Sequence, residues 1–279
     1  MVYTPVNVSA DANTEIQVIG DVTFAMLSNS FGSLLNVSQV SSFDISNDTA
    51  LKGAYMSIYS GVELPKSKSI ENINFTFEDV FDNDINISQY SNLRILDITA
   101  NPRGYDSTIE NLTINNKKLN SIKILGSGGS QIQLKSATVI SADELTKIEV
   151  SDVSMDWNWQ QFVNVEQIVA SGVYDGEIFN LQNLSHLKTL SIAVLNISTL
   201  NLRNSYNIEE LEITSESDSI NTIFVAVTKE SFKTNLVSLF SNNGFSESGT
   251  IHLRDGDPYN TEISSAAIER GWSVEYYTE

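Results

Sequence analysis

The sequence predicts a β-rich solenoid of the α+β kind, in which short parallel strands stack one on the next. Two observations support this fold class. A six-residue template, apolar-x-x-apolar-x-apolar, recurs along the chain, and its last copies are almost evenly spaced. A single strand of this kind cannot bury its own apolar side, but a series can, because each coil covers the apolar side of its neighbours.

The template is clearest at residues 187–192, and the same spacing returns 21 residues later at residues 208–213. The nine matches are Val40/Phe43/Ile45, Ile70/Ile73/Phe75, Leu93/Leu96/Ile98, Ile109/Leu112/Ile114, Leu119/Ile122/Ile124, Leu145/Ile148/Val150, Val165/Ile168/Ala170, Leu187/Leu190/Ile192 and Ile208/Leu211/Ile213. The intervals between their first residues are 30, 23, 16, 10, 26, 20, 22 and 21. The matches that begin at Ile109 and Leu119 lie only 10 residues apart, so this pair is the first in which we expect a chance match.

This pattern resembles leucine-rich-repeat proteins, whose period is 20 to 29 residues and whose strand carries an L-x-x-L-x-L core. The resemblance covers roughly residues 40–215 and implies a leucine-rich-repeat-like array. The sequence departs from that family at its Asn/Cys position, where only Asn101 fits. The other residues at this position are Asp48, Glu78, Lys117, Ser127, Val153, Val173, Leu195 and Glu216. We therefore expect an irregular array, with a parallel β-helix as the alternative geometry.

The chain divides into an N-terminal cap at residues 1–35, a solenoid at 36–215 and an α/β C-terminal cap at 216–279. In the last part, residues 220–227 read as a strand, and Thr228 is placed to cap a helix that follows. A short strand is expected at residues 251–253. Asn260 or Thr261 then caps a second helix, which Gly271 ends, and residues 272–276 return as a strand.

The ending Ala-Ile-Glu-Arg-Gly-Trp-Ser-Val, residues 267–274, is similar to the closing helix-Gly-Trp-strand of irregular repeat proteins encoded by gut Bacteroidetes and their phages. The resemblance is confined to this short motif. It implies a unit that closes the open end of the sheet and a phage or bacterial setting for the protein.

The composition argues against several classes of partner. The chain has 35 acidic and 16 basic residues, a net charge of −19, which opposes attraction to phosphate backbones or anionic lipid. No apolar run reaches the roughly 18 residues that a membrane span requires. The segment after Met1 lacks the basic and apolar regions of a secretory signal, so either the general export route does not carry the chain or a leader has been removed. The retained Met1 favours the first.

The residues that commonly support catalysis or metal binding are sparse. The chain has no cysteine, and its two histidines, His186 and His252, lie in different settings, so we expect no zinc site, no cofactor and no catalytic residue. Residues 82–86, Asp-Asn-Asp-Ile-Asn, carry alternating oxygen ligands like the start of a calcium loop. Ile87 and Leu93 occupy the positions where such a loop needs Gly and Glu.

Trp157 and Trp159, with Phe162 nearby, form the densest aromatic feature. Two tryptophans two residues apart lie on the same side of an extended chain, where they could hold a sugar or an apolar anchor of a partner. The alternative, which we favour, is that these rings pack over the solenoid core.

The residue between the last two apolar positions of each template points outward, because side chains alternate along a strand. These residues are Asp44, Asn74, Asp97, Thr113, Lys123, Glu149, Val169, Ser191 and Glu212. They predict a mainly acidic sheet face suited to a basic or polar partner, although outward residues are also polar simply to keep a protein soluble. The candidate partner-binding residues are Asp44, Asn74, Asp97, Glu149, Ser191, Glu212, Trp157 and Trp159.

We therefore expect a non-enzymatic binding or structural protein that contacts other proteins. A phage virion component fits best, such as a head or tail fibre, a decoration protein or an adaptor. One alternative is an adhesin-like repeat protein at the bacterial cell surface, and another is a carbohydrate-active β-helix enzyme. Glycan binding and a homo-oligomer are both left open.

Overall fold

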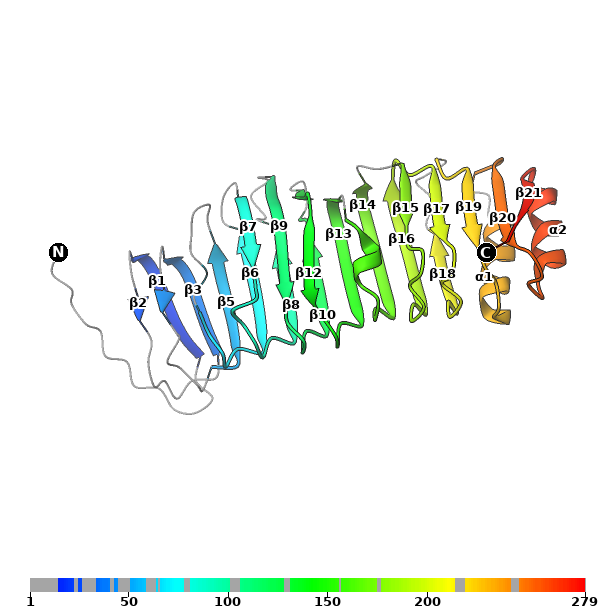
Figure 1. Ribbon diagram of the computed structural model, residues 1–279. Coiled ribbons are helices and arrows are strands. Elements are labelled where there is room, and N and C mark those ends of the chain that lie inside the picture. Colours follow the sequence, from blue (N-terminus) through cyan, green and yellow to red (C-terminus); the bar gives the residue numbers. More distant parts are fainter. Residues whose placement is uncertain are drawn as a thin grey trace.

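The computed structural model shows a rod of stacked strands that runs from the N-terminal region to two helices at the far end (Figure 1). In the first 50 residues only strand backbone is described. The described residues are 15–22, 25–26, 34–40, 43–44, 51–58, 64, 66–77, 81–100, 106–127, 131–155, 157–174, 177–213, 219–241 and 246–278. Every strand pair among them is parallel, which confirms a β-rich solenoid of parallel strands.

One side of the rod is a continuous parallel sheet that we call the front ladder. It collects one strand from each coil in chain order. Its strands are β1 (Glu15–Val22), β3 (Leu34–Val40), β5 (Gly53–Ile58), β6 (Asn72–Phe77), β8 (Ile95–Thr99), β10 (Ser121–Leu125), β13 (Lys147–Met155), β14 (Gln167–Tyr174), β16 (Thr189–Leu195) and β18 (Glu210–Ile213). The middle strands, from β5 to β10, pair without a register shift.

A second series of strands, the back ladder, is interspersed with the front strands along the chain. Its strands are β7 (Asp82–Asn86), β9 (Ser107–Asn115), β11 (Ile132–Leu134), β12 (Ala137–Ser141), β15 (Ile178–Asn180), β17 (Thr199–Leu202), β19 (Thr222–Val225), β20 (Thr250–Arg254) and β21 (Ser273–Tyr277). The two series alternate strictly from β6 to β10 and from β14 to β19. A separate pair, β2 (Ala25–Met26) and β4 (Phe43–Asp44), lies near the N-terminal end. The alternation explains the uneven template intervals, because the match at Ile109 is the back strand β9 and not a chance match.

The core lies between the two ladders and is filled by the alternate residues that the template predicts. In the front ladder Leu96 and Ile98 are fully buried, as are Ile122 and Ile124 in the next coil. The back strands contribute in the same way, for example through Leu200 and Leu202 of β17, of which each is 0 % exposed. Complete burial of one such side chain contributes about 1.5–3 kcal/mol, so each coil depends on the coils on both sides.

Strand β13 bends from one sheet direction to another. Its first half, through Ser151, pairs with β10, while Val153 to Met155 pair with β11. A bulge separates the halves at Asp152, whose φ of 53° is left-handed. The extra residue keeps Ile148, Val150, Val153 and Met155 all buried on one side, since a continuous strand would turn the second half outward.

The back ladder is interrupted after β12, where no described strand pairs with the far edge. The 3₁₀ helix η1 (Trp159–Gln161) lies there instead, and the side chain of Gln161 takes the place of a strand. Its Nε2 donates to the Ala137 carbonyl at 2.9 Å, and its Oε1 accepts from the Val139 N–H at 3.1 Å. One amide side chain therefore satisfies two backbone groups at an open sheet edge.

Helices replace front strands at the C-terminal end. Helix α1 (Glu230–Phe240) buries Phe232, Leu236, Leu239 and Phe240 and lies beside β18, while α2 (Asn260–Arg270) lies against α1 and β21. The Asn235 side chain of α1 donates to the Glu209 carbonyl at 3.0 Å. Helix α1 thus covers the last edge of the front ladder, whereas the motif at residues 267–274 leads into β21, the last strand of the back ladder.

The expected helix caps were partly wrong. Helix α1 begins after Lys229, because Thr228 donates its hydroxyl to the Tyr206 carbonyl at 2.8 Å instead of capping the helix. Asn260 is the first residue of α2 and donates to the Arg254 carbonyl at 2.9 Å. Gly271 does end α2, with a left-handed φ of 97°. In the back ladder β17, before the expected boundary at residue 216, pairs directly with β19, which follows it. Most of the expected cap at 1–35 lies outside the described residues.

The bulge of β13 makes a specific demand on the strand next to it. Gly172 of β14 lies opposite Val153 with a φ of 128°, and an added Cβ would stand 2.3 Å from the Val153 carbonyl oxygen. We predict that Gly172→Ala lowers the free energy of unfolding by roughly 3–4 kcal/mol, measured by urea denaturation.

Gly256→Ala is the matched control. Gly256 has a φ of 82° but nothing within 4 Å of an added Cβ, so backbone strain alone acts there. That variant should lose about 1–2 kcal/mol. Equal losses in the two variants would contradict the close approach of β13 and β14.

Candidate protein-binding face

The outer surface of the front ladder carries one straight row of side chains, which we call the front row. Register pairs join its members from strand to strand without a shift. The front row consists of Tyr55, Asn74, Asp97, Lys123, Glu149, Val169, Ser191 and Glu212. Seven of the nine predicted outward residues lie in this row, and they include five of the six row residues named as candidate partner-binding residues: Asn74, Asp97, Glu149, Ser191 and Glu212.

Two residues of the predicted outward series do not belong to the front row. Asp44 lies in β4, which pairs with β2 and not with the front ladder, and its side chain is outside the described residues. Thr113 lies in β9 on the back ladder, where its hydroxyl accepts a hydrogen bond from Asn111 at 2.9 Å. Thr113 was misplaced because the template has the same form in strands of either ladder, and Asp44 because β4 belongs to neither ladder.

The middle of the front row is a charged centre formed by Asp97, Lys123 and Glu149 on three successive strands. Lys123 Nζ lies 2.9 Å from one carboxylate oxygen of Glu149, and Lys147 Nζ lies 3.4 Å from the other. The hydrogen bond from Lys123 lowers the pKa of Glu149. Burial raises the pKa of Asp97, and Lys123 opposes that rise only in part. Two carboxylates of one row thus differ in proton affinity.

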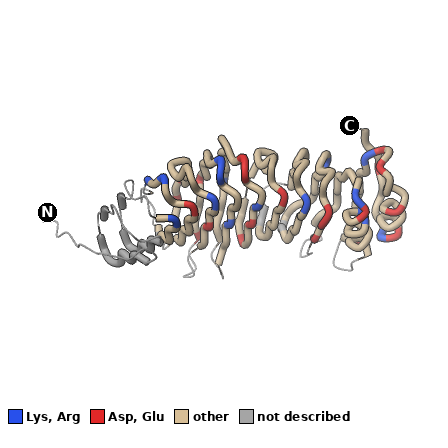
Figure 2. Tube along the Cα trace, turned by 90° about the horizontal axis from the view of Figure 1, so that it is seen from below, with Lys and Arg blue, Asp and Glu red and all other residues tan. Residues whose placement is uncertain are grey.

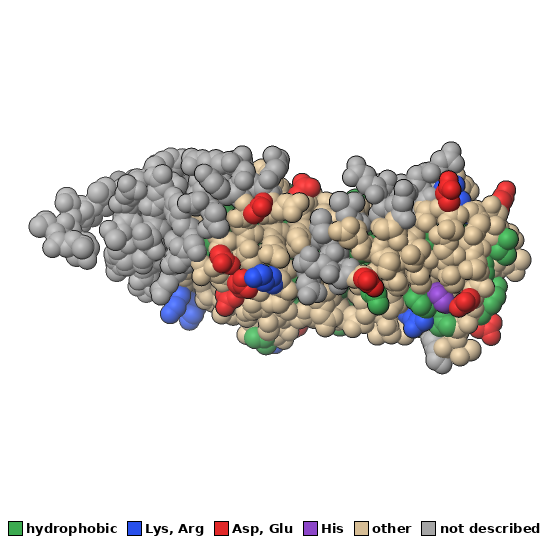
Figure 3. All heavy atoms as spheres, turned by 90° about the horizontal axis from the view of Figure 1, so that it is seen from above, with side chains coloured by type: hydrophobic (Ala, Val, Ile, Leu, Met, Phe, Trp, Pro, Cys, Tyr) green, Lys and Arg blue, Asp and Glu red, His purple; other side chains and the backbone are tan. Residues whose placement is uncertain are grey.

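The C-terminal part of the front row carries acids that hydroxyl groups hold in place. Ser191 donates to Glu212 at 3.0 Å, and Thr189, in the neighbouring row, donates to Glu210 at 3.2 Å. Among the described residues no cation lies within ion-pair distance of Glu210 or Glu212. Elsewhere charges of both signs are spread along the rod (Figures 2 and 3). Two oriented carboxylates therefore remain without a cationic partner on an open face.

Trp157 and Trp159 are not part of a surface. They are 2 % and 1 % exposed, and Trp159 makes an edge contact with Phe179 at a centroid distance of 5.3 Å. With Phe162 they fill the space under η1, where the back ladder is interrupted. The prediction that these rings are candidate contact residues was wrong, because the irregular coil folds them into the core, as the favoured alternative expected.

The candidate metal ligands are held apart. Residues 82–86 form strand β7 instead of a calcium-binding loop, so successive side chains point to opposite sides. Across the part of the chain that the structure describes, no three His, Asp or Glu side chains gather in a way that could hold a metal ion. His186 is exposed near Val163, whereas His252 stacks on Phe224 at 4.1 Å.

Sequence reasoning missed a cluster on the outer surface of the back ladder. The Arg203 guanidinium lies 4.0 Å from the centre of the Phe224 ring and 4.8 Å from that of Tyr277. The Tyr277 hydroxyl donates to the Val225 carbonyl at 3.1 Å, across the intervening strand β20. The alternation Ile223-Phe224-Val225 was a usable signal, since it places Phe224 outward between two buried residues.

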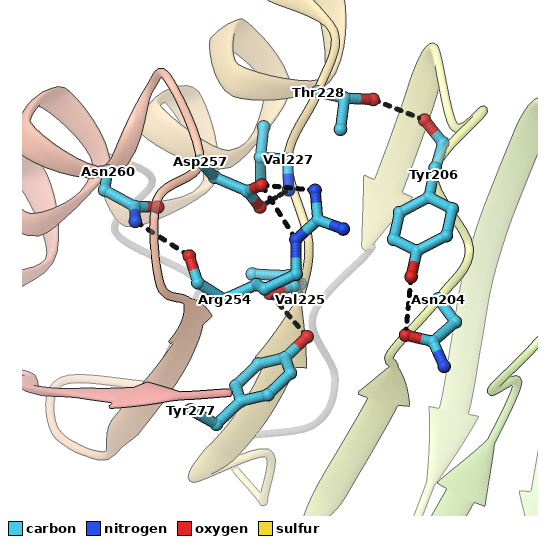
Figure 4. A network of polar contacts seen from close by, with 9 residues as sticks. All are labelled: Asn204, Tyr206, Val225, Val227, Thr228, Arg254, Asp257, Asn260 and Tyr277. Carbon is cyan, nitrogen blue, oxygen red and sulfur yellow. Dashed lines mark hydrogen bonds and ion pairs between the residues drawn. The ribbon is translucent and has the colours of Figure 1, made fainter. Parts of the chain in front are cut away.

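The same end of the rod contains a polar network around Arg254 and Asp257 (Figure 4). Asp257 is buried, accepts from Arg254 Nε at 2.9 Å, and accepts from the Val227 N–H at 2.7 Å. The Arg254 guanidinium also lies 4.7 Å from the centre of the Tyr206 ring. These contacts join β20 to the segment before α1, so the terminal strands and helices are tied together.

Comparison with protein-family models, curated proteins and solved structures found no match to this chain. No helix in the described ranges combines the length and apolar character that crossing a membrane demands.

The raised pKa of Asp97 has a consequence for stability. Folding raises the pKa of the Asp97 carboxyl, so its ionisation is less favourable in the folded state than in the unfolded chain. The folded state therefore has its full stability while the carboxyl is protonated, below the ordinary pKa, and loses part of it as the pH rises through the folded pKa. We predict that Asp97→Asn is more stable than the parent at about pH 7, and that this gain disappears near pH 3, below the ordinary carboxyl value of about 3.9. Urea denaturation of both proteins at both pH values measures this difference in the free energy of unfolding.

Glu144→Gln provides the control, because Glu144 is an exposed acid in a turn away from the front row. Its stability should follow that of the parent at both pH values. A lower stability of Asp97→Asn at neutral pH would show that the interaction with Lys123 outweighs the burial of the carboxylate.

Proposed function

We propose that this chain is a non-enzymatic binding protein whose front row holds a basic surface of another protein. The observation that supports this proposal is the pair Glu210 and Glu212. Their carboxylates are oriented by Thr189 and Ser191 and have no cationic partner among the described residues. A partner that presents Lys or Arg at this spacing would complete two charge-assisted contacts.

We propose that the assembly is a phage virion, in which the chain acts as a head or tail fibre, a decoration protein or an adaptor. The support is the rod shape, with α1 covering the C-terminal edge of the front ladder, together with the resemblance of the 267–274 motif. The back ladder favours a parallel β-helix for the middle coils, since two sides of each coil are strands. The strand–helix alternation of β19, α1, β20 and α2 is closer to the leucine-rich-repeat-like alternative. We propose a solenoid that passes from the first geometry to the second.

The carbohydrate-active alternative would use a pair of carboxylates with separated pKa values, and Asp97 and Glu149 are the best pair on the face. Two features weigh against it. Lys123 lies on the strand between them, where a substrate or water would have to enter, and both oxygens of Glu149 are engaged by lysines. We therefore favour binding over glycoside hydrolysis.

The virion proposal is tested on particles purified from the source of the sequence. Quantitative mass spectrometry should find the chain at a fixed copy number per particle after washing in high salt. Its presence only in the cell-envelope fraction would contradict the virion proposal and favour the adhesin alternative. Hydrolysis of a polysaccharide by the purified chain, abolished in Asp97→Asn, would contradict the non-enzymatic assignment.

The binding face is tested with Glu210→Lys combined with Glu212→Lys. We predict that this variant is incorporated into particles at least roughly tenfold less well than the parent, because it places two cations opposite a basic partner. Asp143→Lys combined with Glu144→Lys changes the net charge equally at an exposed turn and should be incorporated normally. Equal incorporation of both variants would remove the front row from the interface.

A further inference from the structure

The last strand of the back ladder has an open edge. Strand β21 pairs with β20 on one side, and no described strand pairs with its other side. The Ser273 N–H donates to the Gly249 carbonyl at 2.8 Å, and the Tyr277 carbonyl accepts from the Asp255 N–H at 2.9 Å. Because backbone groups alternate in direction along a strand, Val274 and Tyr276 direct their N–H and C=O groups toward the open edge.

Apolar side chains lie beside this edge. Tyr276 is 55 % exposed and Ile268 of α2 is 62 % exposed. The Tyr276 hydroxyl lies 3.1 Å from Ser264 Oγ, and Ser264 is one helical turn before Ile268, so the tyrosine ring lies along that side of α2. Figure 3 shows green apolar side chains gathered at the end of the rod that α2 and β21 form. An exposed edge flanked by apolar groups is unusual unless a partner covers it.

The charge at this edge is negative. Glu275 faces outward on β21 with its side chain 64 % exposed, whereas the carboxylate of Glu262 on α2 is paired with Lys233 Nζ at 3.2 Å. His252 lies 3.3 Å from Glu275 on the neighbouring strand. Burial lowers the pKa of His252, against the opposing effect of Glu275, so the imidazole is mostly uncharged at neutral pH. Among the described residues no Lys or Arg lies within ion-pair distance of Glu275.

We propose that the open edge of β21 binds an extended segment of another protein, which adds one strand to the back ladder. The segment presents a Lys or Arg opposite Glu275 and an apolar residue against Tyr276 and Ile268. Its backbone pairs with the outward groups of Val274 and Tyr276. A second copy of this chain fits less well, since antiparallel pairing of two β21 strands about Glu275 sets the two glutamates opposite each other. The site is independent of the front row.

The test uses a synthetic peptide of about eight residues in which lysine and valine alternate, with binding measured by calorimetry. We expect saturable binding to the full chain, weakened roughly tenfold by Glu275→Lys. Glu144→Lys makes the same charge change at a distant turn and should leave the affinity unaltered. An equal loss in the two variants would show unspecific attraction to an acidic protein and overturn the proposal.

Two variants separate backbone pairing from contact with the ring. Tyr276→Ala and Tyr276→Pro both remove the ring, but only the proline removes the outward N–H, and neither alters the hydrogen bonds to β20. The proline variant should bind at least roughly fivefold more weakly than the alanine variant. Equal affinities would overturn strand addition.

Two further results would contradict the proposal. One is equal binding of a peptide of the same sequence whose backbone amides are methylated, because it keeps the charges but cannot pair as a strand. The other is a dimer in sedimentation that Tyr276→Pro dissociates, since a second copy would then be the occupant. The incorporation of the Glu210→Lys, Glu212→Lys variant into particles tests the front row alone, so its outcome does not affect the tests of the β21 edge.

Discussion

Parallel stacking in register is the constraint on which the rest of this molecule depends. A coil has two strands with apolar inner sides, and these are buried only if the next coil places its own apolar residues at the same height. Ile122 and Ile124 lie in register with Leu96 and Ile98 on one side and with Ile148 and Val150 on the other. A slip of one residue would turn every inner side chain outward. The bulge at Asp152 and the close backbone approach that Gly172 permits are local adjustments that keep the inner side chains in register across a bend.

The same constraint produces the surface on which function is proposed. Because inward residues must lie in register from coil to coil, the outward residues between them lie in register as well. The straight alignment of the front row is a consequence of this packing. Its chemistry is then free to vary, because no core packing depends on it. In the middle the charges neutralise one another through Lys123 and Glu149, whereas at Glu210 and Glu212 they do not. The front row therefore changes from a segment whose charges pair with one another to a segment whose acids have no cationic partner among the described residues.

Sequence periodicity predicted the solenoid, the parallel strands and most of the front row, because burial of alternate residues leaves a direct signal in the chain. It marked the strand at residues 107–115 as a possible chance match, and it placed Thr113 on the same outer face as the front row. Both errors arose because front and back strands share one template. It did not foresee that Gln161 would pair with the edge of β12, because a side chain that replaces a strand has no periodic signal. Asn116 was missed for a related reason. It is buried and donates to the Ile87 and Tyr90 carbonyls, but it lies one residue before the position that the repeat template examines.

The absence of cysteine from the chain allows the register to be measured by disulfide trapping. Val169 and Ser191 are directly opposite in β14 and β16, a separation within the roughly 4.4–6.8 Å between Cα atoms that a disulfide requires. The pair Val169→Cys with Ser191→Cys should form an intramolecular disulfide readily under mild oxidation. Val169→Cys with Ala193→Cys is displaced by two residues, beyond about 7 Å, and should remain largely reduced. Equal trapping of the two pairs would contradict the in-register stacking from which both the core and the front row follow.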